Sequence, residues 1–379
     1  MRFNASEPAP TPFQGRWSCR CCAPWARGRA SRHAAPAGKA RAALGRRRFA
    51  AAGGSEATTA CASPQSIDVH HHIAPRFFIE AVGPERLVNT YPGSRKAAYE
   101  WSPAMAIEDM DRGGTATAVT SLYAAHHLSE LRDPSRVARL CNEYAARMRQ
   151  DFPGRFGVFA CLPMPDVEAS LKEIEYALDV LKADGIYMVT SYGSQWLGDA
   201  SFAPVFEELN RRKAVLYTHP VVPRFAVDLI ADVPDTVIEI NTDTTRAIAS
   251  MLFGGTAGRS PDLDIIWSHG GGTLLPVIER FTRLAQRPQL AARLPRGILH
   301  ELQRFYYDVA QVAHPVPMAA LRKMVPLSQI LFGTDFTFRT ATEINEGLAQ
   351  CGLTAQELRA IQRDNGLRLL PQLKTVQVT

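Results

Sequence analysis

The chain has 379 residues, of which 46% are hydrophobic and 21% are charged. This length suits one large catalytic domain or two of ordinary size, and this balance is typical of a globular protein rather than a disordered one. Its apolar stretches are all shorter than the ~18 residues that a membrane-spanning helix needs. We therefore predict no membrane span.

The net charge of +6 is unevenly distributed along the chain. Residues 1–65 contain 11 Lys and Arg against 2 Asp and Glu, whereas the remaining residues contain 32 basic and 35 acidic ones. Nucleic-acid binding requires a basic stripe on the folded surface. Because the body of the chain is mildly acidic, no nucleic-acid partner is predicted.

Residues 1–64 are rich in Ala, Arg, Gly, Pro and Ser and show no sustained periodicity. We expect this basic tail to be disordered or removed. Arg46, Arg47 and Arg48 precede an Ala- and Gly-rich run that resembles a twin-arginine export signal, and the same composition would suit an organelle transit peptide. The body, residues 65–379, contains only three Cys, as is usual in a reducing compartment. A cytoplasmic location is thus predicted, with export or organelle targeting as alternatives.

From residue 66 onward, short apolar runs alternate with helix-like stretches such as 167–182 and a helix predicted to begin near Asp243. The runs are continuous in apolar residues, as expected of parallel strands buried on both faces. Eight such strands favour a (β/α)₈ TIM barrel over an open doubly wound sheet, which would carry a Gly-rich phosphate loop after its first strand. The predicted strands are 67–71, 117–122, 156–162, 186–191, 214–219, 264–268, 305–310 and 330–334.

Two segments are longer than a plain crossover between strand and helix. Residues 75–115 follow the first predicted strand, and residues 220–242 follow the fifth. On a barrel both would be insertions at the carboxyl face, where loops shape substrate pockets.

Three histidines close the first predicted strand. Because side chains alternate along a strand, His70 and His72 point to one side and His71 to the other. Two imidazoles on one side at the carboxyl end of a barrel strand can chelate a divalent metal. A surface histidine cluster is the alternative interpretation, and this motif alone is only a moderate signal.

Three later strands also end in metal-ligand side chains. Strand five ends at His219, strand six at His269 and strand eight at Asp335. In a barrel these ends converge on one face, and this donor set suits Zn²⁺ or Mn²⁺ with a position open to water. A core histidine or a capping aspartate explains any one of these residues, but their shared position at strand ends favours a metal site.

This order of motifs resembles the amidohydrolase superfamily. The finer similarity is to amidohydrolase family 2, the group that contains aminocarboxymuconate-semialdehyde decarboxylase and the 6-methylsalicylate decarboxylases. The resemblance covers roughly residues 67–371. Besides the ligand motifs, it is carried by residues 173–178, 183–185, 197–199, 204–212, 268–272 and 330–335.

The resemblance implies that His70, His72, His219 and Asp335 hold one divalent metal ion, with Zn²⁺ preferred and Mn²⁺ as the alternative. A single ion is expected because strand four lacks the lysine of binuclear relatives. His269 would be the second-sphere catalytic histidine, and Asp335 would take part in catalysis as well as in metal binding.

Substrate contacts are predicted at three further residues. Arg280 occupies the place of an arginine that in this family reaches a neighbouring subunit's site and binds a substrate carboxylate, which implies a homodimer. A solvated helix charge explains Arg280 equally well, and the late position of Pro276 loosens the correspondence. Tyr192 and Trp196 follow strand four and are candidates for the pocket wall, with core packing as the alternative.

The activity that the resemblance implies is non-oxidative decarboxylation of a small aromatic or heteroaromatic carboxylic acid. The metal would hold the substrate carboxylate, and Asp335 or a metal-bound water, helped by His269, would protonate the ring carbon that CO₂ leaves. The same residues would serve a hydrolase of a lactone, amide or ester, in which Asp335 takes a proton from the metal-bound water. The choice between the two reactions rests on the resemblance, because spacing does not separate them.

Overall fold

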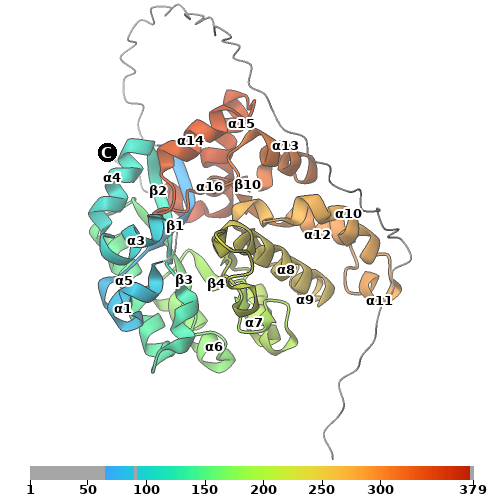
Figure 1. Ribbon diagram of the computed structural model, residues 1–379, viewed down its shortest axis with the longest axis horizontal. Helices are drawn as coiled ribbons and strands as arrows, with labels where there is room; N and C mark the ends of the chain where they lie inside the picture. Colours follow the sequence, from blue (N-terminus) through green and yellow to red (C-terminus); the bar gives the residue numbers. More distant parts are fainter. Residues whose placement is uncertain (1–64, 89–91, 376–379) are drawn as a thin grey trace, which may run out of the picture. The chain divides into compact units, whose positions relative to one another are not determined.

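The computed structural model describes residues 65–88 and 92–375, so the predictions for residues 1–64 lie outside the described residues. Eight strands form one sheet in which every adjacent pair is parallel (Figure 1). They are β1 (Ser66–Ile73), β2 (Thr115–Leu122), β3 (Phe156–Cys161), β4 (Gly185–Val189), β7 (Val215–His219), β8 (Asp264–Trp267), β9 (Tyr306–Asp308) and β10 (Ile330–Leu331). Each predicted strand overlaps one of these.

The sheet closes on itself through the chain that follows β10. The backbone amide of Val69 donates to the carbonyl of Phe332 at 3.0 Å, and the amide of Asp335 donates to the carbonyl of His70 at 2.8 Å. His71 and Phe336 form a parallel bridge between the same two segments. The first and last strands are therefore neighbours, and the predicted TIM barrel is confirmed.

Helices surround the strands, as Figure 1 shows. They are α1 (Arg76–Val82), α2 (Pro84–Leu87), α3 (Pro92–Tyr99), α4 (Pro103–Gly113), α5 (Pro134–Asp151), α6 (Val167–Glu175), α7 (Ala203–Arg211), α8 (Glu239–Phe253), α9 (Thr256–Arg259), α10 (Leu274–Leu284), α11 (Pro288–Ala291), α12 (Ile298–Arg304), α13 (Pro315–Met324), α14 (Ala341–Ala349), α15 (Ala355–Arg359) and α16 (Asn365–Leu369). The predicted helix 167–182 is α6, continued by a π-helical turn over Tyr176–Val180.

Local sequence signals set several helix ends. The Ser102 hydroxyl accepts a hydrogen bond from the backbone of Met105 and caps the start of α4, and Gly114 adopts a positive φ of 71° just after its end. Thr340 and Glu343 form a capping box at the start of α14. Local sequence therefore sets both ends of α4 and the start of α14.

Helix α8 begins earlier than the sequence predicts. The predicted start was near Asp243, whereas α8 begins at Glu239. An Asp before an apolar run is typical of an N-cap, but here the buried Asp243 carboxylate accepts hydrogen bonds from Thr190, Ser191 and Trp196. The Asp243 side chain therefore binds residues of a distant segment instead of capping the start of the helix.

The interior of the barrel is filled by aromatic rings. Tyr217 lies between Phe159 and Tyr187, with ring centroids 5.4 Å and 5.7 Å away, and all three side chains are buried. The Tyr217 ring also lies 5.3 Å from the ring of His70. The core thus packs directly against His70 from within the barrel.

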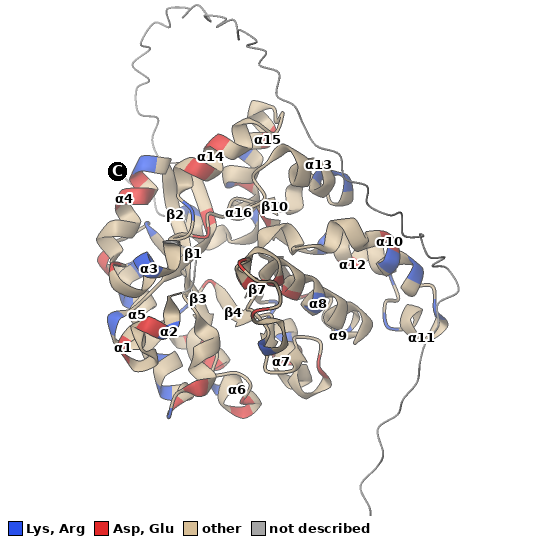
Figure 2. Ribbon diagram, in the orientation of Figure 1, with Lys and Arg blue, Asp and Glu red and all other residues tan. Residues whose placement is uncertain are grey.

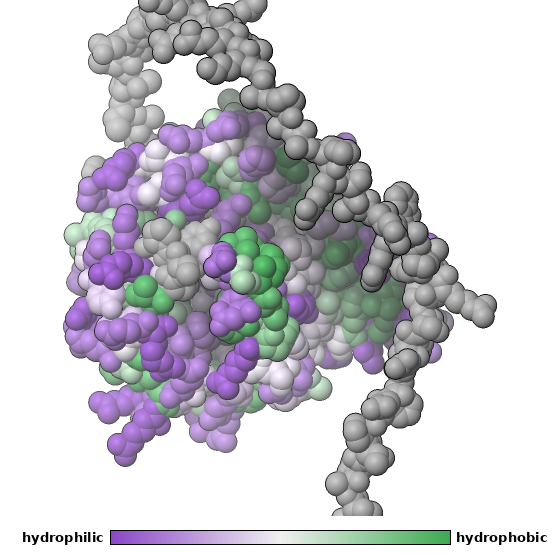
Figure 3. Space-filling view, viewed as in Figure 1, coloured by the Kyte–Doolittle hydropathy of each residue, from purple (hydrophilic) through white to green (hydrophobic). Residues whose placement is uncertain are grey.

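The two predicted insertions follow β1 and β7. The first contains α1 to α4, and the second contains two short 3₁₀ helices, Arg224–Ala226 and Asp235–Val237. The second insertion carries a cluster of exposed apolar side chains, visible as a green patch in Figure 3. We call this the apolar insertion patch, and it consists of Phe225, Val227, Leu229, Ile230, Val233, Val237 and Ile238.

Basic and acidic residues are interspersed over the helices of the described part of the chain (Figure 2). Within the same residues, no helix has the length and apolar character needed to cross a membrane.

Candidate active site at the carboxyl end of the barrel

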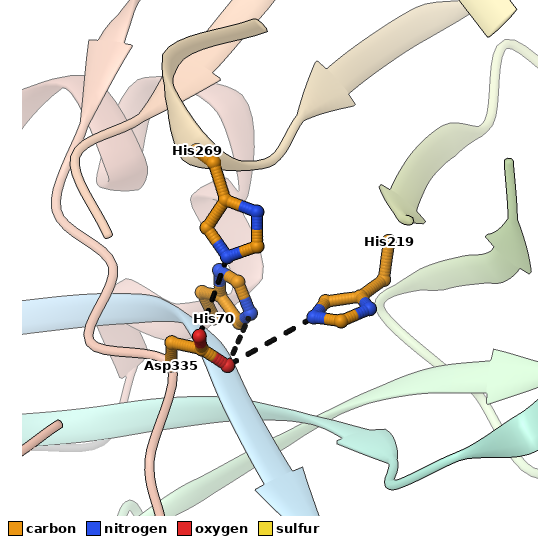
Figure 4. A group of neighbouring side chains, drawn as sticks. All are labelled: His70, His219, His269 and Asp335. Atoms are coloured by element: carbon orange, nitrogen blue, oxygen red, sulfur yellow. Dashed lines mark hydrogen bonds and ion pairs between the residues drawn. The ribbon is translucent and has the colours of Figure 1, made fainter. Parts of the chain in front are cut away.

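Five side chains from four strand ends converge on one point. His70 and His72 come from β1, and His219 ends β7. His269 lies in the segment after β8, which ends at Trp267, and Asp335 lies in the segment after β10, which ends at Leu331. Figure 4 shows His70, His219, His269 and Asp335 pointing toward one another. The Asp335 Oδ1 atom lies 3.1 Å from the Nε2 atoms of both His70 and His72 and 3.8 Å from Nε2 of His219. The structure therefore brings together every predicted metal ligand.

Hydrogen bonds at the far side of two rings fix which nitrogen faces the centre. Nδ1 of His219 donates to the carbonyl oxygen of Pro220 at 2.9 Å, and Nδ1 of His70 donates to the Asp308 carboxylate at 2.9 Å. With its proton on Nδ1, each neutral ring would turn the Nε2 lone pair toward Asp335. This second layer of partners is the usual support of metal-binding histidines.

The residues present fit a divalent cation. The buried Nε2 of His219 has no hydrogen-bond partner among the described residues, although its ring faces the cluster. Nε2 of His70 and Nε2 of His72 lie 3.3 Å apart, and two nitrogens bound tetrahedrally to one ion at about 2.1 Å would be separated by about 3.4 Å. An ion between these atoms would satisfy nitrogens that otherwise face each other.

The charges of the cluster agree with this interpretation. Burial lowers the pKa of His72 to about 3 and that of His219 to about 4, so both rings are neutral at pH 7, as metal binding requires. Burial also lowers the pKa of His70, but Asp308 and Asp335 outweigh it and raise that pKa to about 10. In metal-free protein, the proton on His70 thus supplies positive charge that a bound ion would otherwise supply.

The two oxygens of Asp335 have different neighbours. Oδ1 faces His70, His72 and His219, whereas Oδ2 lies 3.3 Å from Nε2 of His269 and accepts a 2.6 Å hydrogen bond from Gln311. Burial raises the pKa of Asp335, but the charge of His70 and the hydrogen bonds from the histidines outweigh it and hold this pKa well below its usual range. Asp335 is therefore a carboxylate at neutral pH.

His71 lies outside the cluster, as strand alternation predicts. Its Nδ1 atom is 3.0 Å from the Asp68 carboxylate, and its ring stacks on Phe336 at a centroid distance of 4.5 Å. Asp68 also accepts hydrogen bonds from the hydroxyl and the backbone amide of Thr334. This network joins β1 to the chain after β10 and has a structural role.

A pocket of about 180 Å³ opens beside the cluster and includes His219 in its wall. Its lining is largely apolar and aromatic, with a few polar groups, which is typical of a small-molecule site. The lining residues are Arg86, Leu87, Tyr123, Ala124, His126, His127, Tyr187, Val189, His219, Pro220, Val221, Val222, Thr236, Ile240 and Phe338.

None of the three residues predicted to contact substrate lines this pocket, and their contact with substrate stays a prediction. The Tyr192 hydroxyl accepts a 3.1 Å hydrogen bond from the backbone of Val189, and the Trp196 indole donates to Asp243 at 2.7 Å. Both belong to the hairpin of β5 (Ser191–Tyr192) and β6 (Gln195–Trp196), and neither lines this pocket. Arg280 is exposed on α10, and its contact with a neighbouring subunit stays a prediction.

Sequence reasoning missed several residues of the site. Asp308 ends the seventh strand, so the strand-end signal that identified the ligands applies to it as well. His126 follows β2 in a 3₁₀ helix, Ala125–Glu130, and Thr236 lies within the insertion after β7. Neither belongs to a recognisable motif, and only the folded loops bring both to the pocket.

A family model for amidohydrolases matches residues 67–372. Decarboxylase yanB of Aspergillus niger is 33% identical over 331 residues, which cover 81% of this chain and 88% of that protein. The 6-methylsalicylic acid decarboxylase of Penicillium expansum is 31% identical over 321 residues, covering 82% and 97%. A crystal structure of a dihydroxybenzoic acid decarboxylase from Polaromonas with bound manganese matches with a TM-score of 0.71 at 19% identity, covering 82% of this chain and 98% of that one.

The match with the family model spans the whole barrel and includes each strand end that contributes to the cluster. The resemblance deduced from the motifs is therefore confirmed, and the chain belongs to the amidohydrolase family.

Proposed function

We propose that this protein is a metal-dependent, non-oxidative decarboxylase of a small aromatic or heteroaromatic carboxylic acid. The observation that carries the proposal is the cluster of four histidines and Asp335, of which only His219 is partly exposed, beside a small, largely apolar pocket. The similarity to two fungal decarboxylases at 31% and 33% identity supports this reaction over hydrolysis. A metal-dependent hydrolase of a lactone, amide or ester is the alternative, because the same donors would serve it.

In this proposal His70, His72, His219 and Asp335 hold the metal ion. When bound, the ion would supply Lewis-acid chemistry at the substrate carboxylate. The His-rich donor set favours Zn²⁺, while the manganese in the Polaromonas decarboxylase supports Mn²⁺ as the alternative. Elemental analysis of the purified protein distinguishes the two.

We assign delivery of the proton to Asp335 and His269. Decarboxylation replaces CO₂ with a proton at the ring carbon, so a group beside the pocket must deliver that proton. Nε2 of His269 and Oδ2 of Asp335 lie 3.3 Å apart, and Gln311 donates to the same oxygen. This pair can hold and transfer one proton, and His269 can stabilise charge on the substrate oxygen as it changes.

We also propose that the protein is a homodimer that acts on its substrate through Arg280 of a second copy. The exposed position of Arg280 and the apolar insertion patch support this, because monomers rarely expose large contiguous apolar surfaces (Figure 3). Light scattering coupled to size exclusion measures the mass of the assembly.

The reaction is tested by measuring CO₂ release from a panel of hydroxybenzoic acids and a uracil carboxylic acid. We expect release from at least one acid, and loss of release after chelation with recovery on adding Zn²⁺ or Mn²⁺. A parallel panel of lactones, amides and esters tests the alternative. Metal-dependent hydrolysis without any CO₂ release would replace the proposed reaction with the hydrolase.

A further inference from the structure

We propose that His126 and Thr236 recognise a neutral hydrogen-bonding substituent, such as a hydroxyl group, on the ring of the substrate and thereby set the preference among aromatic acids. This inference rests on the proposed function and names the substrate class more narrowly. It concerns two residues from 3₁₀ helices that contribute no ligand to the cluster, Ala125–Glu130 and Asp235–Val237.

The size of the pocket limits the substrate. Its volume of about 180 Å³ lies below the roughly 300–1,000 Å³ of sites for drug-sized ligands. Aromatic and branched side chains form most of its wall, among them Tyr123, Tyr187, Phe338 and Ile240. A single aromatic ring suits this space, with its carboxylate directed toward the metal ligands.

Thr236 lines this pocket and carries an unpaired hydroxyl. Its Oγ1 atom is buried and has no hydrogen-bond partner within the described part of the chain. Buried polar groups in proteins almost always have a partner. A substituent on the bound ring would supply the partner that the protein itself does not.

His126 adds a neutral imidazole to the same pocket. Burial, helped by the adjacent His127 ring at a centroid distance of 4.1 Å, lowers the pKa of His126 to about 3. At neutral pH the ring therefore carries one N–H donor and one bare acceptor nitrogen. No hydrogen bond joins this imidazole to another described residue, so it is available to a ligand.

The charges around the pocket disfavour a second carboxylate. Arg86 lines the pocket, but Glu130 forms an ion pair with it. The Glu130 carboxylate also lies 3.0 Å from Nδ1 of His127 and 3.8 Å from Arg224. The charge of Arg86 is thus already balanced by Glu130. A neutral substituent on the substrate matches the uncharged side chains of His126 and Thr236.

The test uses 2-hydroxybenzoic acids that carry either a hydroxyl or a methyl group at ring position 4 or 5. The two groups are similar in size but differ in hydrogen bonding. A site built to bind a hydroxyl discriminates strongly against an analogue without it. We expect kcat/KM for the hydroxyl acid to exceed that for the methyl acid by roughly 10-fold or more at one of the positions.

Variants test whether Thr236 and His126 cause this difference in kcat/KM between the hydroxyl acid and the methyl acid. Thr236→Val and His126→Phe are each expected to lower the ratio at least about 5-fold, whereas Thr236→Ser, which keeps the hydroxyl, should retain it. Ile240→Val is the matched control, because it changes the pocket wall without removing a polar atom. Metal content of each variant confirms that the site has folded.

Binding separates failure of this inference from failure of the proposed function. Calorimetric Kd values for the same acids are measured on metal-loaded His269→Ala protein, with and without Thr236→Val. A hydroxyl preference in Kd that Thr236→Val removes supports the inference even if no acid loses CO₂. Equal kcat/KM and Kd for hydroxyl and methyl acids at both positions, or ratios that neither variant changes, would overturn it while leaving decarboxylation intact.

Discussion

At the scale of single residues, the site is organised by which atom of each side chain faces the centre. Oδ1 of Asp335 faces three imidazoles, while Oδ2 faces His269 and Gln311. Asp308 orients two of these residues, since it binds Nδ1 of His70 and accepts a 3.0 Å hydrogen bond from the backbone amide of His269. In the proposed function, metal binding and proton transfer would therefore use different oxygens of one carboxylate.

His70→Ala and His219→Ala are each expected to reduce metal content sharply, as is His72→Ala, because each removes a nitrogen that faces the cluster. His71→Ala should keep about one ion per chain, although it loses the bond to Asp68 and is expected to lower thermal stability. Elemental analysis and melting temperatures on all four variants provide the measurement. Loss of metal from His71→Ala with retention in His70→Ala would contradict the orientation of β1.

His269→Ala separates catalysis from metal binding. We expect it to keep about one metal ion per chain but to lose turnover by roughly 10²-fold or more, the magnitude of general acid–base catalysis. Asp335→Asn should lose turnover and also bind metal more weakly. Ligand atoms of His269, His70, His219 and Asp335 all lie within 4.8 Å of one another, so an inactive, metal-free His269→Ala protein would make His269 a ligand.

At the scale of elements, the β5–β6 hairpin is attached to α8 by one buried carboxylate. Burial raises the pKa of Asp243, while hydrogen bonds from Thr190, Trp196 and Ser191 lower it. The hairpin therefore supplies the partners that this carboxylate needs in the interior.

Trp196→Phe removes the indole donor to Asp243 and is expected to lower the free energy of unfolding by about 1.5–3 kcal/mol, the range for hydrogen bonds to charged groups. Trp101→Phe is the matched control, because the buried indole nitrogen of Trp101 has no partner among the described residues. Urea denaturation of both variants measures the difference. Equal losses of stability would show that ring packing, rather than the hydrogen bond, holds the hairpin.

At the scale of the whole molecule, buried neutral histidines make stability depend on pH. The folded-state pKa values of His126, His72 and His219 lie near 3, 3 and 4, below the usual 6.5. The unfolded chain therefore binds more protons below pH 6.5, and the stability from these groups falls as pH drops from about 6.5 toward about 3. In metal-free protein the stability contributed by His70 has the opposite pH dependence, because its pKa is raised. That contribution is lost as the pH rises rather than as it falls.

We expect the melting temperature of metal-free protein to fall between pH 7 and pH 5, and to fall less for His126→Phe than for the unsubstituted chain. The phenyl ring cannot take up a proton, so one of the acid-sensitive groups is removed. Thermal melts of both proteins at the two pH values measure this. An equal decrease in both would show that His126 does not contribute to acid sensitivity.

A chain beginning at Ser63 is expected to keep its melting temperature and its metal content. The described fold begins at Gln65, whose backbone amide donates to the carbonyl of Gly114, and β1 starts at the next residue. Expression, melting temperature and elemental analysis of the shortened and full-length chains test this. Loss of folded protein on truncation would place residues 1–62 within the stable fold.

The sequence by itself determined the strands, the barrel and the convergence of the candidate metal ligands. Buried parallel strands are continuous apolar runs, and the polar residue that ends each run identifies the carboxyl face without further information. Alternation along β1 also separates His70 and His72 from His71, because it depends only on strand geometry. These features follow from local periodicity and from the rule that the carboxyl ends of all barrel strands lie on one face.

Only the tertiary structure decided which side chains surround the pocket beside the cluster. Arg86 lies in α2, and His126 and Thr236 lie in two short 3₁₀ helices. These short helices belong to segments that connect barrel strands, so their positions depend on contacts between segments distant in sequence. The start of α8 depends in the same way on the hydrogen bonds that Asp243 accepts from Ser191 and Trp196 of the β5–β6 hairpin. Short-range patterns specify regular elements, whereas loop positions result from long-range packing and charge balance that no local pattern encodes.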